Sequence, residues 1–561
     1  MKKTTCFILT AFVAGCQIIA AQSGKNDTIA RRSVIIERDY VPTIKNTDKL
    51  DITPIITEPE IKKAEAIYSE KMNLLKPEYE VNKWPAAAIH LDQNSYKKGY
   101  ALLGFGMYGT ALGDVFYPIV DDGSQSLTFD THIHGLFGNT QRQWITNFGL
   151  NYVTRLENFD LNMGAYFKRN GFNYYGVTGS YFNTFNTSYK DSTNNFINFG
   201  LKAGIKSKGD AEAIAYKANV EYNNFTPGTG LGEQKIHITG NVELPVGEHR
   251  LGLNIDDYNL FYSKFNGQQL YPNHSIVGVN PYFDLKGEQW GVRLGLKDYF
   301  SINGKDKSTH LMPDVTAQID LTKTVNLYAG ITGEYDVNSM QKITDENPYI
   351  DPTWRVDDSY APVKVFGGLK FSPTSGLLLD GSVAYTSYNK QYFYTNQYKG
   401  YFGPTIALYP APNPYALLPT FTTLYDKANV VTAKLNIGYN WKDKIFAHLN
   451  ARYNNWDTKT LDKAWMKPST EIEVGGEAKV TRNIFVNANY YFAGGRYAYL
   501  YGTESAKMKN VNDLSLGASY SYSDWLTAFI RLNNVMETKY QTYYGYDSLG
   551  LNWQIGAAVS F

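Results

Sequence analysis

Residues 431–441 read Val-Thr-Ala-Lys-Leu-Asn-Ile-Gly-Tyr-Asn-Trp, and this stretch decides the fold class. Every second residue from Val431 to Trp441 is apolar, and the residues between them are polar or glycine. Because side chains of a β-strand alternate between its two faces, this pattern predicts one apolar and one polar face. An amphipathic helix would instead repeat every 3.6 residues. The apolar face is predicted to consist of Val431, Ala433, Leu435, Ile437, Tyr439 and Trp441.

The same alternation recurs from about residue 100 to the end, for example in residues 445–454 and 472–480. The segments run to about 10–13 residues, the length that a tilted strand needs to cross a bilayer. Short connections such as 442–443 alternate with long ones such as 336–361 and 389–428. The connection 155–159 is expected among the long ones, although it is short. We therefore expect an all-β fold, a transmembrane antiparallel β-barrel of about 22 strands (range 18–22) with both termini in the periplasm.

The composition agrees with a membrane barrel and excludes other classes. Aromatic residues make up 15% of the chain, and membrane barrels use them as girdles at both interfaces. The mean hydropathy is −0.36, and no apolar window after the N-terminus is long enough for a spanning helix. The net charge of +1 gives no basic surface for nucleic acid.

The N-terminus is predicted to be an export signal. Lys2 and Lys3 precede an apolar stretch that ends in small residues, with cleavage expected near Ala21. The alternative is a lipoprotein signal, because Val-Ala-Gly precedes Cys16, which would then be acylated. We expect residues 1–22 to be the signal peptide, 23–98 a mostly extended, short periplasmic segment, and 99–561 the barrel.

The last strand carries a second targeting pattern. Residues 551–561 alternate strictly and end in an aromatic residue, which is typical of an outer-membrane assembly signal. This predicts the outer membrane of a Gram-negative bacterium as the location. The expected partners are its lipid and lipopolysaccharide, the barrel-assembly machinery during insertion, and other envelope proteins. The residues assigned to this signal are Trp553, Ile555, Val559 and Phe561.

A family resemblance enters at the C-terminal end. The stretch Leu532-Asn533-Asn534-Val535, then Tyr540, then Tyr544-Gly545-Tyr546 and the closing strand, is similar to the end of TonB-dependent receptors. The resemblance covers the barrel, about four-fifths of the chain, and implies a 22-stranded transporter or receptor barrel for a nutrient or ligand. The motif is loose, because the chain lacks the usual proline and has Ser548-Leu549-Gly550 in place of a Pro-Gly-Arg.

The resemblance fails at the front of the chain. Residues 23–98 are too few for the plug domain of that family, and they contain prolines and many charges but little glycine. We therefore expect a receptor-like barrel without a typical plug. Residues 33–37, Ser-Val-Ile-Ile-Glu, could pair with TonB as a strand or could be an ordinary apolar stretch. Because an open pore of this size would breach the membrane, we expect residues 23–91, the external loops or a partner to occlude it. Aromatic residues on the polar face could pack against whatever fills the lumen: Tyr328, Phe446, Phe485, Tyr491 and Phe529.

Two long connections are candidate binding sites. The stretch 389–428 is rich in aromatic residues and proline, which suits a ligand- or partner-binding loop, although its first aromatics could instead extend the interface girdle. The stretch 344–360 holds five acidic residues, including Asp357 and Asp358, and could hold calcium or be a solvated acidic loop. The aromatic candidates are Tyr392, Phe393, Tyr394, Tyr398, Tyr401, Phe402, Tyr409 and Tyr415.

No catalytic or cofactor motif is present in the sequence. There is no phosphate-binding glycine loop, no Gly-x-Ser-x-Gly turn and no cysteine cluster, so we expect no enzyme activity, no cofactor and no metal. His132 and His134 could share a metal, but a solvated lumen position is the simpler interpretation. A non-transporting accessory or structural subunit of an outer-membrane assembly is the main alternative to a transporter or receptor; an outer-membrane enzyme is a distant third.

Overall fold

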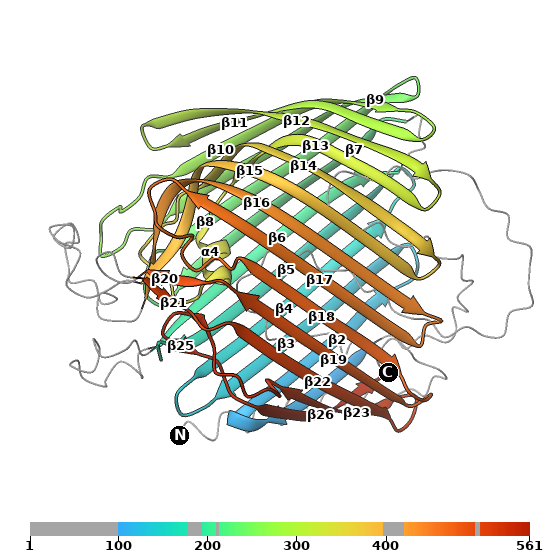
Figure 1. Ribbon diagram of the computed structural model, residues 1–561, viewed down its shortest axis with the longest axis vertical. Coiled ribbons are helices and arrows are strands. Elements are labelled where there is room, and N and C mark those ends of the chain that lie inside the picture. The colour runs from blue at the N-terminus through green and yellow to red at the C-terminus, as the bar shows by residue number, and fades with distance from the viewer. Residues whose placement is uncertain (1–98, 177–192, 209–212, 397–419, 500–504) are drawn as a thin grey trace, which may run out of the picture.

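In a computed structural model of the protein, the described residues are 99–176, 193–208, 213–396, 420–499 and 505–561. Twenty-two strands form one antiparallel sheet in which each strand pairs with its neighbours in the chain. β1 pairs with both β2 and β26, so the sheet closes into a barrel (Figure 1). The predicted fold class and strand number are confirmed.

The barrel strands are β1 (Tyr100–Gly106), β2 (Thr110–Asp121), β3 (Gln125–Phe137), β4 (Arg142–Arg155), β5 (Phe159–Asn173), β6 (Thr193–Ser207), β7 (Ala215–Pro227), β8 (Glu233–Val246), β9 (His249–Tyr262), β10 (His274–Lys286), β11 (Trp290–Asn303), β12 (Asp306–Thr322), β13 (Val325–Asp336), β14 (Ser359–Thr374), β15 (Leu377–Asn396), β16 (Phe421–Trp441), β17 (Ile445–Thr458), β18 (Thr470–Lys479), β19 (Ile484–Gly494), β22 (Val511–Ser521), β23 (Leu526–Asn533) and β26 (Asn552–Ser560). The connections contain η2 (Met107–Gly109), α4 (Met340–Glu346), β20 (Tyr497–Tyr499), β21 (Ser505–Lys507), β24 (Gln541–Tyr543) and β25 (Tyr546–Asp547). No helix among the described residues is long and apolar enough to cross a membrane.

The outer face of the barrel is apolar, as the alternation predicts. On β16, Val431, Leu435, Tyr439 and Trp441 are each about two-fifths exposed, at 40%, 40%, 38% and 43%. Exposed apolar side chains recur at alternate positions of the other strands. A surface of this kind is stable only against lipid, because each exposed apolar side chain would cost free energy in water.

The two ends of the barrel differ in the length of their connections. One end, which we call the short-turn end, carries tight turns such as residues 375–376 and 442–444, and the C-terminus lies there (Figure 1). The backbones of Gly99 and Phe561 exchange hydrogen bonds at this end, of 2.8 and 3.0 Å. The connection 156–158 also belongs to it, so the expectation that it lies among the long connections was wrong. The long-loop end holds α4 and the small hairpins.

Luminal aromatic side chains lie flat along the wall. Tyr328 covers Gly368, where a Cβ would overlap its ring, and its hydroxyl donates to Asp380 at 2.7 Å. Phe529 covers Gly556 in the same way. Glycine is required at such positions because the ring occupies the space of a side chain. Tyr328 and Phe529, two of the five luminal aromatic residues predicted from the sequence, therefore pack against the wall itself.

Candidate functional site: a loop latched across the barrel mouth

The connection between β13 and β14, residues 337–358, folds against the inner wall at the long-loop end; we call it the mouth loop. Its helix α4 begins after Ser339, whose hydroxyl accepts from the backbone N–H of Lys342 at 3.2 Å. Both carboxylate oxygens of Glu233, on β8, accept from the N–H of Met340, at 3.0 and 2.9 Å. A short helix in which these N–H groups were unpaired would be unstable, so the barrel wall supplies part of its cap.

Apolar packing holds the mouth loop on both sides. Met340 is buried in one cluster with Leu260 and Ile276, whose side chains point into the lumen. Ile343 and Ile350 are fully buried in a second cluster, which we call the mouth cluster, with residues from six further connections or strand ends. The mouth cluster contains Tyr175, Ile343, Ile350, Val356, Tyr392, Tyr394, Phe421, Met466, Ala498, Met508, Tyr543 and Tyr546.

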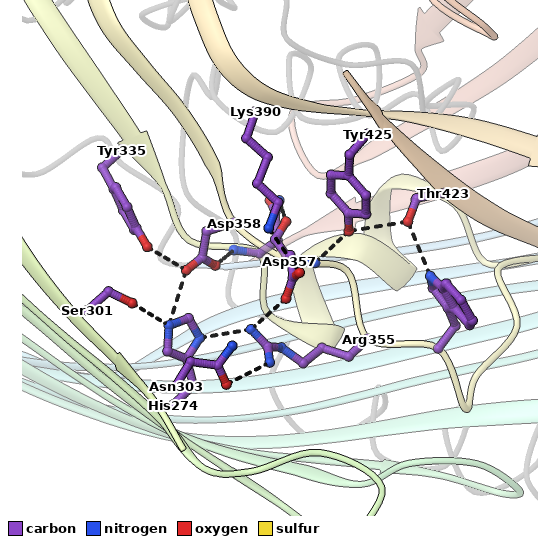
Figure 2. A network of polar contacts seen from close by, with 12 residues as sticks. His274, Ser301, Asn303, Tyr335, Arg355, Asp357, Asp358, Lys390, Thr423 and Tyr425 are labelled. Atoms are coloured by element: carbon purple, nitrogen blue, oxygen red, sulfur yellow. Dashed lines mark hydrogen bonds and ion pairs between the residues drawn. The ribbon is translucent and has the colours of Figure 1, made fainter. Parts of the chain in front are cut away.

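A buried polar network, which we call the latch, ties the end of the mouth loop to the wall (Figure 2). At its centre is Arg355, 7% exposed. Its guanidinium donates to Asn303 Oδ1 and to His274 Nδ1, both at 3.1 Å, and pairs with Asp357 at 2.9 Å. It also lies over the ring of Tyr262, 5.5 Å from its centre. Arginine suits this position because its planar group donates in several fixed directions at once.

The contact with Arg355 fixes the protonation of His274. A guanidinium can only donate, so Nδ1 of His274 must accept and the ring proton resides on Nε2. That nitrogen lies 2.9 Å from Ser301 Oγ and 3.4 Å from a carboxylate oxygen of Asp358. His274 is therefore a neutral bridge between the arginine and the carboxylate.

The two neighbouring carboxylates of the latch have different environments. Asp358 accepts from the Tyr335 hydroxyl at 2.9 Å and from the N–H of Asn338 at 3.0 Å, and burial raises its pKa to about 6. Burial also acts to raise the pKa of Asp357, but Arg355 and Lys390 outweigh it, so that pKa lies below its usual value. Lys390 Nζ lies 2.9 Å from Asp357.

The latch continues onto β16. The Tyr425 hydroxyl accepts from the backbone N–H of Asp357 at 2.6 Å, and Trp354 donates to Thr423 at 3.2 Å. Hydrogen bonds and ion pairs from five strands, β10, β11, β13, β15 and β16, thus hold one segment of five residues, 354–358. Side chains that share partners in this way form one cooperative network, which holds the mouth loop against the wall.

This arrangement corrects the expectation of a solvated acidic loop. Asp351 is fully buried and Asp358 is 7% exposed, because their oxygens accept hydrogen bonds within the fold. Among the described residues, no group of three or more His, Cys, Asp and Glu side chains could hold a metal ion, which gives no support to a calcium site in this loop.

The predicted aromatic loop is shorter than expected, and its first part is buried. Residues 389–396 continue β15 and residues 421–428 belong to β16. Tyr392, Phe393 and Tyr394 are 4%, 0% and 3% exposed. They neither face lipid nor present a free surface to a ligand; Tyr392 donates instead to Glu346 of α4. The remaining candidates lie outside the described residues: Tyr398, Tyr401, Phe402, Tyr409 and Tyr415.

The residues assigned to the assembly signal lie on or next to β26. Trp553, Ile555 and Val559 occupy alternate positions of this strand, and Phe561 follows it and contacts Tyr117, with ring centres 5.8 Å apart. Their role in assembly stays a prediction. Cys16 and the signal peptide lie outside the described residues.

One feature of the sequence, apart from the strand alternation, indicates that this connection is ordered. Arg355 stands two and three residues before Asp357 and Asp358, in a connection that also holds several large apolar residues. A solvated loop has little use for so many apolar side chains, so this composition favours an ordered, inward-packed connection. These apolar residues include Val337, Met340, Ile343, Ile350 and Val356.

Several solved outer-membrane receptors share the architecture of this chain. FpvA of P. aeruginosa, solved with bound heterologous pyoverdines, matches with a TM-score of 0.62 at 13% identity, over 83% of this chain and 72% of that one. The ferric-catecholate import receptor Fiu of E. coli K12 matches with a TM-score of 0.60 at 9% identity, over 83% of each chain. The siderophore receptor PirA of Acinetobacter baumannii matches with a TM-score of 0.59 at 10% identity, over 83% and 80%. No family model and no curated protein matches the sequence.

At these identities the likeness shows the fold. The chain is a 22-stranded barrel of the kind found in outer-membrane receptors, and its apolar outer face agrees with that location.

Proposed function

We propose that the protein is an outer-membrane transporter or receptor component for a nutrient or ligand, and that the mouth loop is its gate. The observation that carries the proposal is the latch: a loop held across the lumen by one shared network of side chains. A barrel with a purely structural role has no need of a buried arginine and a buried carboxylate, which cost free energy to desolvate. The fold shared with siderophore receptors supports the same function.

In this proposal the long-loop end faces the exterior and the short-turn end faces the periplasm, as is usual for outer-membrane barrels. Residues 23–98 would lie in the periplasm and would not form a typical plug. Lipopolysaccharide would surround the outer rim, and the assembly machinery would recognise the last strand. We propose no catalytic activity and no cofactor.

Single-cysteine labelling on intact cells tests the orientation. Lys264 is exposed in the long-loop connection 263–273, and Lys442 is exposed in a short turn. A membrane-impermeant maleimide should label the Lys264→Cys variant and spare Lys442→Cys until the cells are lysed. The reverse pattern would refute the orientation.

Uptake and pull-down experiments separate the two main functions. Loss of uptake of one solute class on deletion of the gene supports a transporter or receptor. Co-purification with a fixed set of envelope proteins, together with unchanged uptake of every solute tested, supports the alternative of an accessory subunit.

A further inference from the structure

The barrel wall separates between β12 and β13 at the long-loop end. Their ladder reaches only to the pair Asp314↔Thr332, so the first eight residues of β12 pair with β11 alone. Beyond a register shift, residues 334–336 of β13 pair with β14 alone. Met312, which is 1% exposed, packs against Gly333 at the point where the pairing of the two strands ends. We call this unpaired stretch of the wall, residues 306–313 of β12 and 333–336 of β13, the notch.

Four aromatic side chains line the inner side of this notch as one continuous strip. Tyr299 stacks on Tyr335, with ring centres 5.2 Å apart and planes 11° from parallel. His310 lies against Tyr335 at 5.0 Å and against Tyr360 at 4.3 Å. All four side chains are partly exposed, whereas the aromatic residues of the mouth cluster are mostly buried. The strip therefore keeps an exposed side, while Tyr299 and Tyr335 also pack against the buried cluster that contains Met340.

Two carboxylates accept hydrogen bonds from the strip. The hydroxyl of Tyr299 donates to Asp256 at 3.3 Å, and the hydroxyl of Tyr335 donates to Asp358 at 2.9 Å. Acidic groups at the ring edges disfavour an anionic ligand by charge repulsion. They suit a ligand with many hydroxyl groups, because carboxylates are strong acceptors.

We propose that this strip, Tyr299, His310, Tyr335 and Tyr360, is a binding site for a neutral sugar ring. A flat face of C–H groups packs well on a continuous aromatic surface. A cationic ligand would be served better by rings that converge into a cage, whereas Tyr299 and Tyr335 stack on each other with nearly parallel planes. The proposal rests on the receptor function and deepens it by naming the class of ligand.

The position of Tyr335 would couple this site to the latch. Its ring belongs to the strip, and its hydroxyl holds Asp358 of the mouth loop. A sugar that shifts the ring would weaken the bond to Asp358. Tyr335 is therefore a positioning residue for the gate as well as part of the binding surface.

Titration calorimetry on the purified full-length barrel tests the site. The probes are hexasaccharides of glucose, mannose and xylose in α and β linkages. We expect at least one to bind, and we expect Tyr360→Ala and His310→Ala each to weaken it about fivefold to tenfold, the usual contribution of one aromatic contact. Tyr491→Ala is the matched control, because Tyr491 also points into the lumen but bonds to Glu471 on another part of the wall. Tyr335→Phe should keep the affinity and release the mouth loop.

Several results would overturn the proposal. The first is that no saccharide of the panel binds. The second is that binding survives both strip substitutions. The third is that the Tyr491→Ala control loses as much affinity as the strip variants. Binding of a ferric catecholate or of choline to the strip in place of every sugar would also refute it. Each of these results leaves the gate untouched, since the gate is tested by substitutions in the latch.

Discussion

Replacing Arg355 by alanine should release the mouth loop while the barrel stays folded. The side chain is 4% exposed and has four partners: Asn303, His274, Asp357 and the ring of Tyr262. Removing one member of a buried charged network costs about 3–5 kcal/mol, because the partners stay desolvated. The Asp357 side chain is 41% exposed, so water replaces part of its lost contact and we take the lower value, about 3 kcal/mol. That shifts the closed-to-open ratio of the loop by about two orders of magnitude.

Two assays read out the release. Trypsin should cut after Lys342, within α4, much faster in Arg355→Ala than in the wild type, and mass spectrometry identifies the cut. Planar-bilayer recordings should show higher conductance, measured both in the full chain and after removal of residues 23–91, so that occlusion by the N-terminal segment is separated from the gate.

Arg293→Ala is the matched control for this prediction. Arg293 also pairs with a carboxylate, Asp284, at 2.7 and 2.8 Å, and lies over a tyrosine ring, but it is on the wall and these contacts involve no mouth-loop residue. It should leave both readouts unchanged. If Arg355→Ala folds, as judged by heat-modifiable migration, and its loop is still protected, or if Arg293→Ala opens the loop equally, the reasoning is refuted.

Four further predictions follow from the fold and its ends. Burial raises the pKa of Asp358 from 3.8 to about 6, so its protonation favours the docked loop: docking should tighten as pH falls from 6 towards 4 and should not change through this group above 6. Hydrogen exchange of the α4 amides, corrected for the intrinsic rate, should show this dependence, and Asp358→Asn should abolish it. Gly252→Ala should lower stability by about 1–3 kcal/mol, because its Cβ would overlap the ring of Tyr282, whereas Gly381→Ala has open space and should be silent in thermal unfolding. Deleting Phe561 should reduce the heat-modifiable fraction, and an unchanged amount of folded barrel would argue against a C-terminal signal. Removing residues 23–91 should raise conductance if that segment occludes the pore, and a large, steady conductance from the intact chain would contradict occlusion altogether.

The sequence by itself determined the barrel. Alternation from Val431 to Trp441, repeated in the other segments, gave the strand class and the lipid-facing side, because strand geometry forces neighbouring side chains to opposite faces. The even strand number placed both ends of the sheet together, where Gly99 meets Phe561. These are consequences of local geometry, which a linear pattern records.

Only the tertiary structure decided the gate and the notch. Arg355 meets His274 across 81 positions of sequence, and Tyr543 donates to Glu346 across 197. The burial of Asp358 and of Tyr392 depends on such distant partners, and so does the separation of β12 from β13. The sequence of a charged or aromatic loop does not show whether the loop is solvated or folded inward. The free energy that decides between the two comes from contacts that closure of the barrel creates.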